Sequence, residues 1–132
     1  MVIERATRQR HAIRAAIAAA RRPLTSQEVL DEARGTVAGL GLATVYRNLK
    51  LLVAEGAIEI ITLPGEPTRY EAAGSAHHHH VQCTRCRRVF DMPGCPGDLR
   101  RLAPRGFRVE GHEVTLYGRC SDCDKHRTRA GR

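Results

Sequence analysis

The sequence contains no tryptophan and few other aromatic residues, with three tyrosines and two phenylalanines in 132 residues. A chain of this length with so few large side chains buries a small core, and small cores often depend on a bound metal. No apolar run approaches the roughly 20 residues of a membrane-spanning helix, and the first residues do not form a secretory signal pattern. We therefore expect a cytoplasmic protein that does not associate with membranes, in a compartment where thiols stay reduced.

Acidic residues are absent between positions 5 and 22, where six arginines occur. The whole chain has 22 Lys and Arg against 14 Asp and Glu, which gives a formal net charge of +8. This excess favours a polyanionic partner such as nucleic acid, although a solvated helix face has the same composition.

The first half of the chain predicts three helices. Apolar residues recur at helical spacing over residues 5–20 and 42–55, and Thr25 with Glu28 forms a capping box that begins a helix between them. A glycine-bearing break precedes the third helix, and this arrangement fits a helix-turn-helix. An ordinary three-helix bundle with a polar surface has the same pattern and stays open as an alternative. Arginine and asparagine can recognise guanine and adenine edges. The candidate DNA-contacting residues are Arg8, Arg10, Thr44, Tyr46, Arg47, Asn48 and Lys50.

Two strands are predicted next, over residues 57–62 and 68–71, with a turn rich in proline and glycine between them. A hairpin directly after the third helix makes the module a winged helix. The second half is predicted to be strand-rich, with a long strand over residues 107–118 and a mobile basic tail from residue 125. The fold class is therefore α+β, with residues 1–71 as the DNA-binding domain, 72–76 as a hinge and 77–132 as a second, metal-binding domain.

The cysteines form two Cys-x-x-Cys pairs, Cys83 with Cys86 and Cys120 with Cys123. Each such turn supplies two sulfur ligands, and two turns complete the tetrahedron that zinc prefers. Redox cysteines or two disulfides are the alternatives, and the reducing compartment favours a structural Zn²⁺ site.

Four consecutive histidines, residues 77–80, run directly into the first of these pairs. Read as an extended segment, they alternate between two faces. His77 and His79 then point to one side and His78 and His80 to the other, so the run offers two ligands to each of two sites. The alternative is a solvated polar run.

Together these segments resemble the ferric uptake regulator family, from about Thr7 to Cys123. The residues that carry the resemblance are Leu42-Ala43-Thr44-Val45-Tyr46-Arg47-Asn48-Leu49, the run from His77 to Cys86, His112, and Tyr117-Gly118-Arg119-Cys120 with Cys123. The resemblance implies a homodimeric, metal-dependent transcription factor, in most members a repressor. It implies an N-terminal winged helix and a C-terminal α/β dimerisation domain with a four-cysteine zinc site.

The resemblance also implies two further cation sites. Glu71, His78, His80 and Asp91 match the ligands of a regulatory site at the hinge, for Zn²⁺, Fe²⁺ or Mn²⁺. An additional site would use His77, His79, His112 and either Asp98 or Cys95. One departure is that many members supply a ligand just before the second helix, where this chain has residues 21–24, Arg-Arg-Pro-Leu.

The expected function is a metal-responsive repressor that binds a double-stranded DNA operator as a homodimer. A peroxide sensor of the same family, in which iron oxidises a histidine ligand, is the nearest alternative. An enzyme is not expected, because a zinc deaminase needs His-x-Glu and Pro-Cys-x-x-Cys, and neither occurs. A zinc-ribbon module without metal sensing is the remaining alternative.

Overall fold

The computed structural model describes residues 2–74 and 78–130. The chain divides into two compact units, Met1–Ser75 and Ala76–Arg132, which are described separately. Within the described residues, no helix combines the length and the apolar character needed to cross a membrane.

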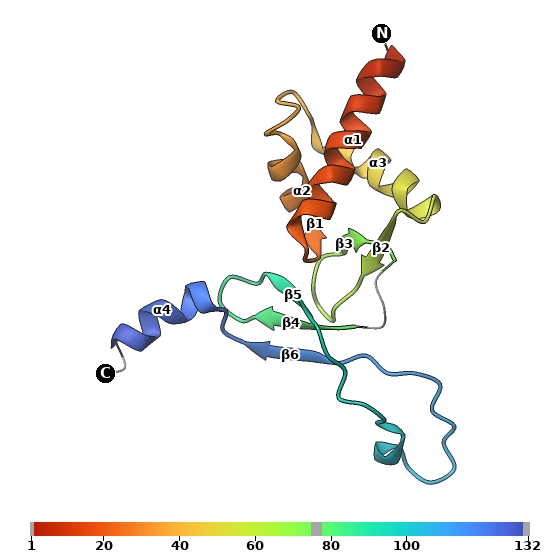
Figure 1. Ribbon diagram of the computed structural model, residues 1–132, viewed down its shortest axis with the longest axis vertical. Coiled ribbons are helices and arrows are strands. Elements are labelled where there is room, and N and C mark those ends of the chain that lie inside the picture. Colours follow the sequence, from red (N-terminus) through yellow and green to blue (C-terminus); the bar gives the residue numbers. More distant parts are fainter. Residues whose placement is uncertain (1, 75–77, 131–132) are drawn as a thin grey trace. The chain divides into compact units, whose positions relative to one another are not determined.

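Three helices make up most of the N-terminal unit: α1 (Val2–Ala20), α2 (Ser26–Ala33) and α3 (Leu42–Ala54) (Figure 1). The predicted capping box is present at α2, because the Thr25 side chain accepts from the Glu28 amide and Glu28 accepts from the Thr25 amide. Helix α3 ends before Gly56, whose φ of 78° is the left-handed conformation that glycine favours after a helix.

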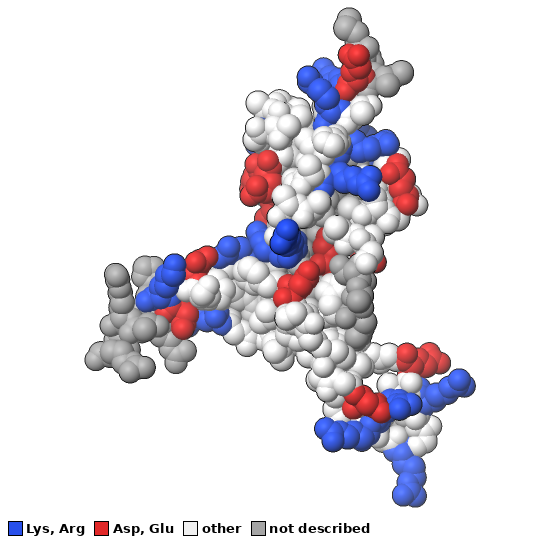
Figure 2. Space-filling view, in the orientation of Figure 1, with Lys and Arg blue, Asp and Glu red and all other residues white. Residues whose placement is uncertain are grey.

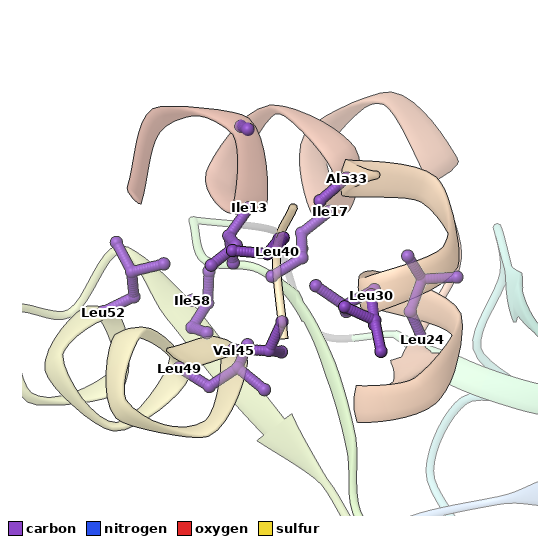
Figure 3. Packing of buried hydrophobic residues seen from close by; sticks show 12 residues of the cluster. Ile13, Ile17, Leu24, Leu30, Ala33, Leu40, Val45, Leu49, Leu52 and Ile58 are labelled. Atoms are coloured by element: carbon purple, nitrogen blue, oxygen red, sulfur yellow. The ribbon is translucent and has the colours of Figure 1, made fainter. Parts of the chain in front are cut away.

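The three helices enclose one apolar core. Figure 3 shows isoleucines of α1 and leucines of α3 pointing into the space between the helices. Leu42 is an exception to the predicted stripe, since it is exposed at the first position of α3. The buried residues of this cluster are Ala12, Ile13, Ile17, Leu24, Val29, Leu30, Ala33, Leu40, Val45, Leu49, Leu52 and Ile58.

A three-stranded antiparallel sheet completes the N-terminal unit, with the order β1-β3-β2. Its hairpin, β2 (Ile58–Ile61) and β3 (Arg69–Ala72), is the predicted wing. The short strand β1 (Leu24–Thr25) pairs with β3 and was not predicted. It links the start of α2 to the wing, so the N-terminal unit is one packed body.

The C-terminal unit contains a second three-stranded sheet with the order β5-β4-β6. The central strand β4 (His79–Cys83) is antiparallel to β5 (Val89–Met92) and parallel to β6 (Thr115–Gly118). A 3-10 turn, η1 (Arg100–Leu102), lies in the long connection between β5 and β6 (Figure 1).

One prediction for this unit was wrong. The strand expected over residues 107–118 is regular only over Thr115–Gly118, because β6 pairs with β4 and β4 begins at His79, so the earlier residues have no partner strand. Residues 125–130 of the basic tail lie in α4 (Ser121–Ala130), and the mobility expected of the tail stays a prediction.

Candidate metal centres and DNA-binding face

The parallel pairing of β4 and β6 brings the two Cys-x-x-Cys turns together. Cys83 ends β4 and is paired with Gly118, so Cys120 follows directly beside it. The sulfur atoms of Cys83, Cys86, Cys120 and Cys123 all lie within 4.8 Å of one another.

The spacing of these sulfurs fits one zinc ion. Tetrahedral zinc with bonds of about 2.3 Å places its sulfur ligands about 3.8 Å apart, and the Cys86 and Cys120 sulfurs are separated by 3.8 Å. The four-cysteine cluster therefore fits a structural zinc site in both donor type and geometry.

Backbone amides prepare the first turn for a cation. The N–H groups of Cys120 and Cys86 each donate to the Cys83 sulfur at 3.4 Å. These bonds, that from Cys120 first, lower the pKa of Cys83 to about 5. The turn closes through Arg87, which has a φ of 68° and donates its N–H to the Cys83 carbonyl at 3.0 Å.

Cys123 has the opposite electrostatic environment. Burial and the neighbouring sulfurs raise its pKa to about 12. A bound cation stabilises thiolates, so zinc binding at this cluster would displace the Cys123 proton.

A second cluster lies at the start of β4 and on β5. The Nε2 atoms of His78 and His80 lie 3.6 Å and 3.3 Å from one carboxylate oxygen of Asp91. The two imidazole rings are 4.9 Å apart, centroid to centroid. Two nitrogens and one oxygen converging in this way form an incomplete ligand set for a divalent first-row metal.

The intervening histidine, His79, takes part in a third cluster. It is only 1% exposed, and its Nε2 lies 3.3 Å from the sulfur of Cys95, which in turn lies 3.2 Å from Nε2 of His112. Nδ1 of His79 accepts the Val114 N–H at 3.0 Å, which fixes the orientation of the ring.

Of the two alternatives for the third cluster, the structure brings Cys95 to the histidines. Asp98 instead accepts from the Arg100 side chain through both carboxylate oxygens, at 2.8–3.1 Å. These hydrogen bonds lower the pKa of Asp98 to about 2. His77, the other predicted ligand, lies outside the described residues.

The remaining predicted ligand, Glu71, belongs to β3 of the N-terminal unit and is 4% exposed. Its neighbour in β3, Tyr70, pairs with Leu24, the last residue of the segment 21–24 that lacks a ligand. Arg22 of that segment donates to Glu28 at 2.9 Å and so supports the start of α2.

Most of the candidate DNA-contacting side chains lie on the surface of the N-terminal unit. Tyr46, Arg47 and Lys50 are exposed on α3. Arg47 donates to the Thr44 hydroxyl at 3.0 Å, and Ser26 donates to the Tyr46 hydroxyl at 3.1 Å. On the face shown in Figure 2, basic side chains follow the part of this unit labelled α1 and α3 in Figure 1.

The structure differs from the sequence prediction at Asn48, which was expected to contact a base. It is 8% exposed, and its amide nitrogen donates to the Thr44 carbonyl at 2.9 Å. The reason is positional, because Asn48 lies on the same helix stripe as the buried residues Val45 and Leu52. Arg8 and Arg10 lie on α1, where Arg10 also pairs with Glu55 at 3.3 Å.

Sequence reasoning missed one side chain of the zinc cluster. Arg88 contacts two of the cysteine sulfurs, at 3.3 and 3.7 Å. The available signal was its place two residues after Cys86, where a long basic side chain can fold back onto the turn.

Comparisons with known proteins give one consistent result. The ferric uptake regulator family matches residues 4–117. The chain is 30% identical over 125 residues to the peroxide operon regulator of Bacillus subtilis, covering 92% of this chain and 85% of that protein. It is also 30% identical over 126 residues to the zinc uptake regulation protein of Mycobacterium tuberculosis, covering 90% and 94%. A solved structure of a zinc-bound manganese uptake regulator superposes with a TM-score of 0.71 at 25% identity, covering 85% and 87%.

Proposed function

Because this chain belongs to the ferric uptake regulator family of metal-responsive transcriptional regulators, we propose that it is a repressor whose operator binding requires a regulatory divalent cation. The cation would be held by His78, His80 and Asp91 of the C-terminal unit together with Glu71 of the N-terminal unit. The protein would act as a homodimer on a pseudo-palindromic site. The observation that carries the proposal is the convergence of His78 and His80 on one oxygen of Asp91.

The donor set indicates which cations the site would take. Imidazole and carboxylate suit Zn²⁺, Fe²⁺ and Mn²⁺, and none of these ligands is a thiolate that would restrict the site to softer ions. The ligands therefore limit the site to this class of divalent cation, and the supply of each metal in the cell determines which cation occupies it.

Glu71 would couple the cation to DNA binding. It lies near the end of the wing strand, only seven positions before His78 in the sequence, so a cation bound by both would restrain the segment that joins the two units. A cation changes the equilibrium only by binding the restrained form more tightly, by about 1–3 kcal/mol in typical allosteric proteins. DNA would raise the affinity for the cation by the same factor.

The exposed side chains of α3 would read the operator. Arg47 would donate to a guanine edge, and Tyr46 and Lys50 would contact phosphates or a thymine methyl. In a symmetric dimer two such helices would enter successive major grooves, about 34 Å apart.

The third cluster would hold a second cation. His79, Cys95 and His112 offer two nitrogens and one sulfur, a set that favours Zn²⁺ over Mn²⁺ because of the thiolate. This cation would stabilise the connection between β5 and β6 in the C-terminal unit.

The test is an operator-binding titration with each divalent ion at one stated salt concentration, because phosphate contacts make the affinity salt-dependent. The double variant His78→Ala with His80→Ala should lose the cation dependence and keep the zinc content of the four-cysteine cluster. His11→Ala, which removes an exposed histidine of α1, is the matched control for general loss of imidazole. Equal operator affinity of the natural protein with and without added cation would refute the proposal.

A peroxide sensor is the second candidate, favoured by the likeness to the Bacillus subtilis peroxide operon regulator. In this case Fe²⁺ at the regulatory site would activate hydrogen peroxide, which would transfer one oxygen atom to the ring of His78 or His80 and release the other as water. Mass spectrometry of the iron-loaded protein after peroxide treatment distinguishes the two candidates, since the simple metal sensor gains no oxygen on either histidine.

A further inference from the structure

The four sulfurs of the zinc cluster receive different hydrogen-bond donors. The Cys83 sulfur accepts hydrogen bonds from two backbone N–H groups. Cys86 and Cys120 are contacted by one side chain that reaches both of them. For Cys123, no N–H donor is found among the residues whose side chains the structure describes.

The side chain at Cys86 and Cys120 is that of Arg88. Its Nε donates to the Cys86 sulfur at 3.3 Å, and its Nη2 donates to the Cys120 sulfur at 3.7 Å. One guanidinium group therefore contacts one cysteine from each Cys-x-x-Cys turn.

Two further contacts hold the guanidinium in place. Nη2 of Arg88 also donates to Asp122, in the first turn of α4, at 3.2 Å. The guanidinium carbon lies 5.5 Å from the ring centroid of Phe90, within the range of a cation–π contact. An arginine side chain is always charged in proteins, so this guanidinium brings a positive charge to the sulfurs.

We propose that Arg88 is a positioning residue of the zinc site, which holds Cys86 and Cys120 as ligands and slows the loss of the ion. Four thiolates on one Zn²⁺ carry a net charge of about −2. A guanidinium beside two of the sulfurs offsets this charge, and its fixed planar fork suits contact with two acceptors at once. The proposal rests on zinc occupancy of the four cysteines and is independent of the regulatory cation.

The proposal and the solvent exposure of the sulfurs predict different orders of cysteine modification. Among the four cluster cysteines only Cys86 is exposed, so access alone predicts that a thiol reagent modifies it before the other three. Cys95, which is also exposed, lies outside this cluster and is scored separately. Because a hydrogen-bonded, charge-compensated thiolate is a poorer nucleophile, we expect Cys123 to react before Cys86 and Cys120.

The experiment uses the full-length, zinc-loaded protein and the variants Arg88→Gln, Arg88→Lys and Arg85→Gln. Iodoacetamide is added, which a thiolate attacks with loss of iodide. A chromophoric chelator reports zinc release, and mass spectrometry maps the modified cysteines. Arg88→Gln should release zinc about 10-fold faster, the lower range for loss of an outer partner of a metal ligand, and its Cys86 and Cys120 should react early. Arg88→Lys should be intermediate.

Arg85→Gln is the matched control, because it removes the same charge from the same turn at an exposed side chain. It should release zinc at the natural rate. A spectroscopic measurement separates charge compensation from simple loss of structure: in the Co²⁺-loaded protein, Arg88→Gln should shift the thiolate-to-metal charge-transfer band to longer wavelength.

The proposal is overturned if Arg88→Gln and Arg85→Gln release zinc equally fast, or if Cys86 is modified before Cys123 in the natural protein. An Arg88→Gln chain that takes up no zinc, beside an Arg88→Lys chain that does, supports it.

Discussion

The two units of this protein are stabilised by different means. The N-terminal unit buries a continuous apolar cluster drawn from its three helices and its sheet. In the described part of the C-terminal unit, Cys83 and Val89 are the only apolar side chains that are fully buried. Beside them lie His79 and Gln82, each 1% exposed.

The difference shows where the C-terminal unit obtains its stability. Its interior is polar, and each buried polar group needs a partner: His79 accepts from the Val114 N–H, and Gln82 donates to the Arg87 carbonyl at 3.2 Å. With so little apolar surface removed from water, a zinc ion bound by four sulfurs supplies the stabilisation that the core does not. The N-terminal unit is hence expected to fold without metal, whereas the C-terminal unit is expected to fold only when zinc is bound.

Removing the zinc should produce the largest effect. Cys120→Ser, or a strong chelator, should eliminate about 10 kcal/mol of binding free energy and unfold the sheet of β4, β5 and β6. Hydrogen exchange measured by mass spectrometry should then show fast exchange in His79–Cys83, with α1 and α3 still protected. Simultaneous loss of protection in both units would contradict the comparison.

A cavity in the apolar core is the converse test. Leu49→Ala should cost the N-terminal unit about 2–5 kcal/mol, because the surrounding side chains refill the space only in part. Denaturant unfolding followed by helix circular dichroism measures this, and the zinc content should not change. Leu51→Ala, at a side chain 46% exposed on the same helix, is the control and should cost less than about 0.5 kcal/mol.

The smallest effect concerns pH and the start of α2. Burial raises the pKa of Glu28, but hydrogen bonds from Thr25 and Arg22 outweigh it and leave that pKa below the ordinary 4.5. Stability from Glu28 is therefore present above pH 4.5 and is lost as the pH falls through the lower folded value. Glu28→Gln should abolish this loss, with a difference of about 0.5 kcal/mol for a partly exposed pair.

This pH effect is followed by nuclear magnetic resonance signals of α2, which report on the N-terminal unit alone. Gln27→Glu is a useful control, because it adds a carboxylate outside the capping box. An identical acid response in Glu28→Gln and the natural protein would show that protonation of Glu28 does not contribute.

Much of the fold is set by local signals that the sequence displays. Thr25 with Glu28, and Gly56 after α3, act within one helical turn, and the predicted cap and helix end were confirmed. By contrast, β1 depends on pairing with β3, about 45 positions later in the chain, and its two residues carry no strand pattern of their own. Residues 107–114 have alternating polarity but no neighbouring strand in the described part of the chain, so pattern alone overextended β6.

The metal sites and their neighbours divide in the same way, into features set by local spacing and features that depend on contacts in the folded chain. The Cys-x-x-Cys spacing identifies the zinc cluster because each pair is local. The assignment between Cys95 and Asp98 depended on a hydrogen bond from Arg100 to Asp98, which competes with the histidines. Arg88 was missed because its role depends on both turns being present at once. The burial of Asn48 was missed because one helix stripe carries both apolar and polar side chains.

The parallel alignment of β4 and β6 gives zinc a further part in folding. A slip of one residue between these strands would displace the two cysteine turns by about 3.3 Å and reverse the face of every side chain. The four sulfurs would then no longer surround a single ion, and His79 would exchange sides with His78 and His80. Zinc binding thus selects the correct strand register, since only a sheet with that register brings the four sulfurs together around one metal ion.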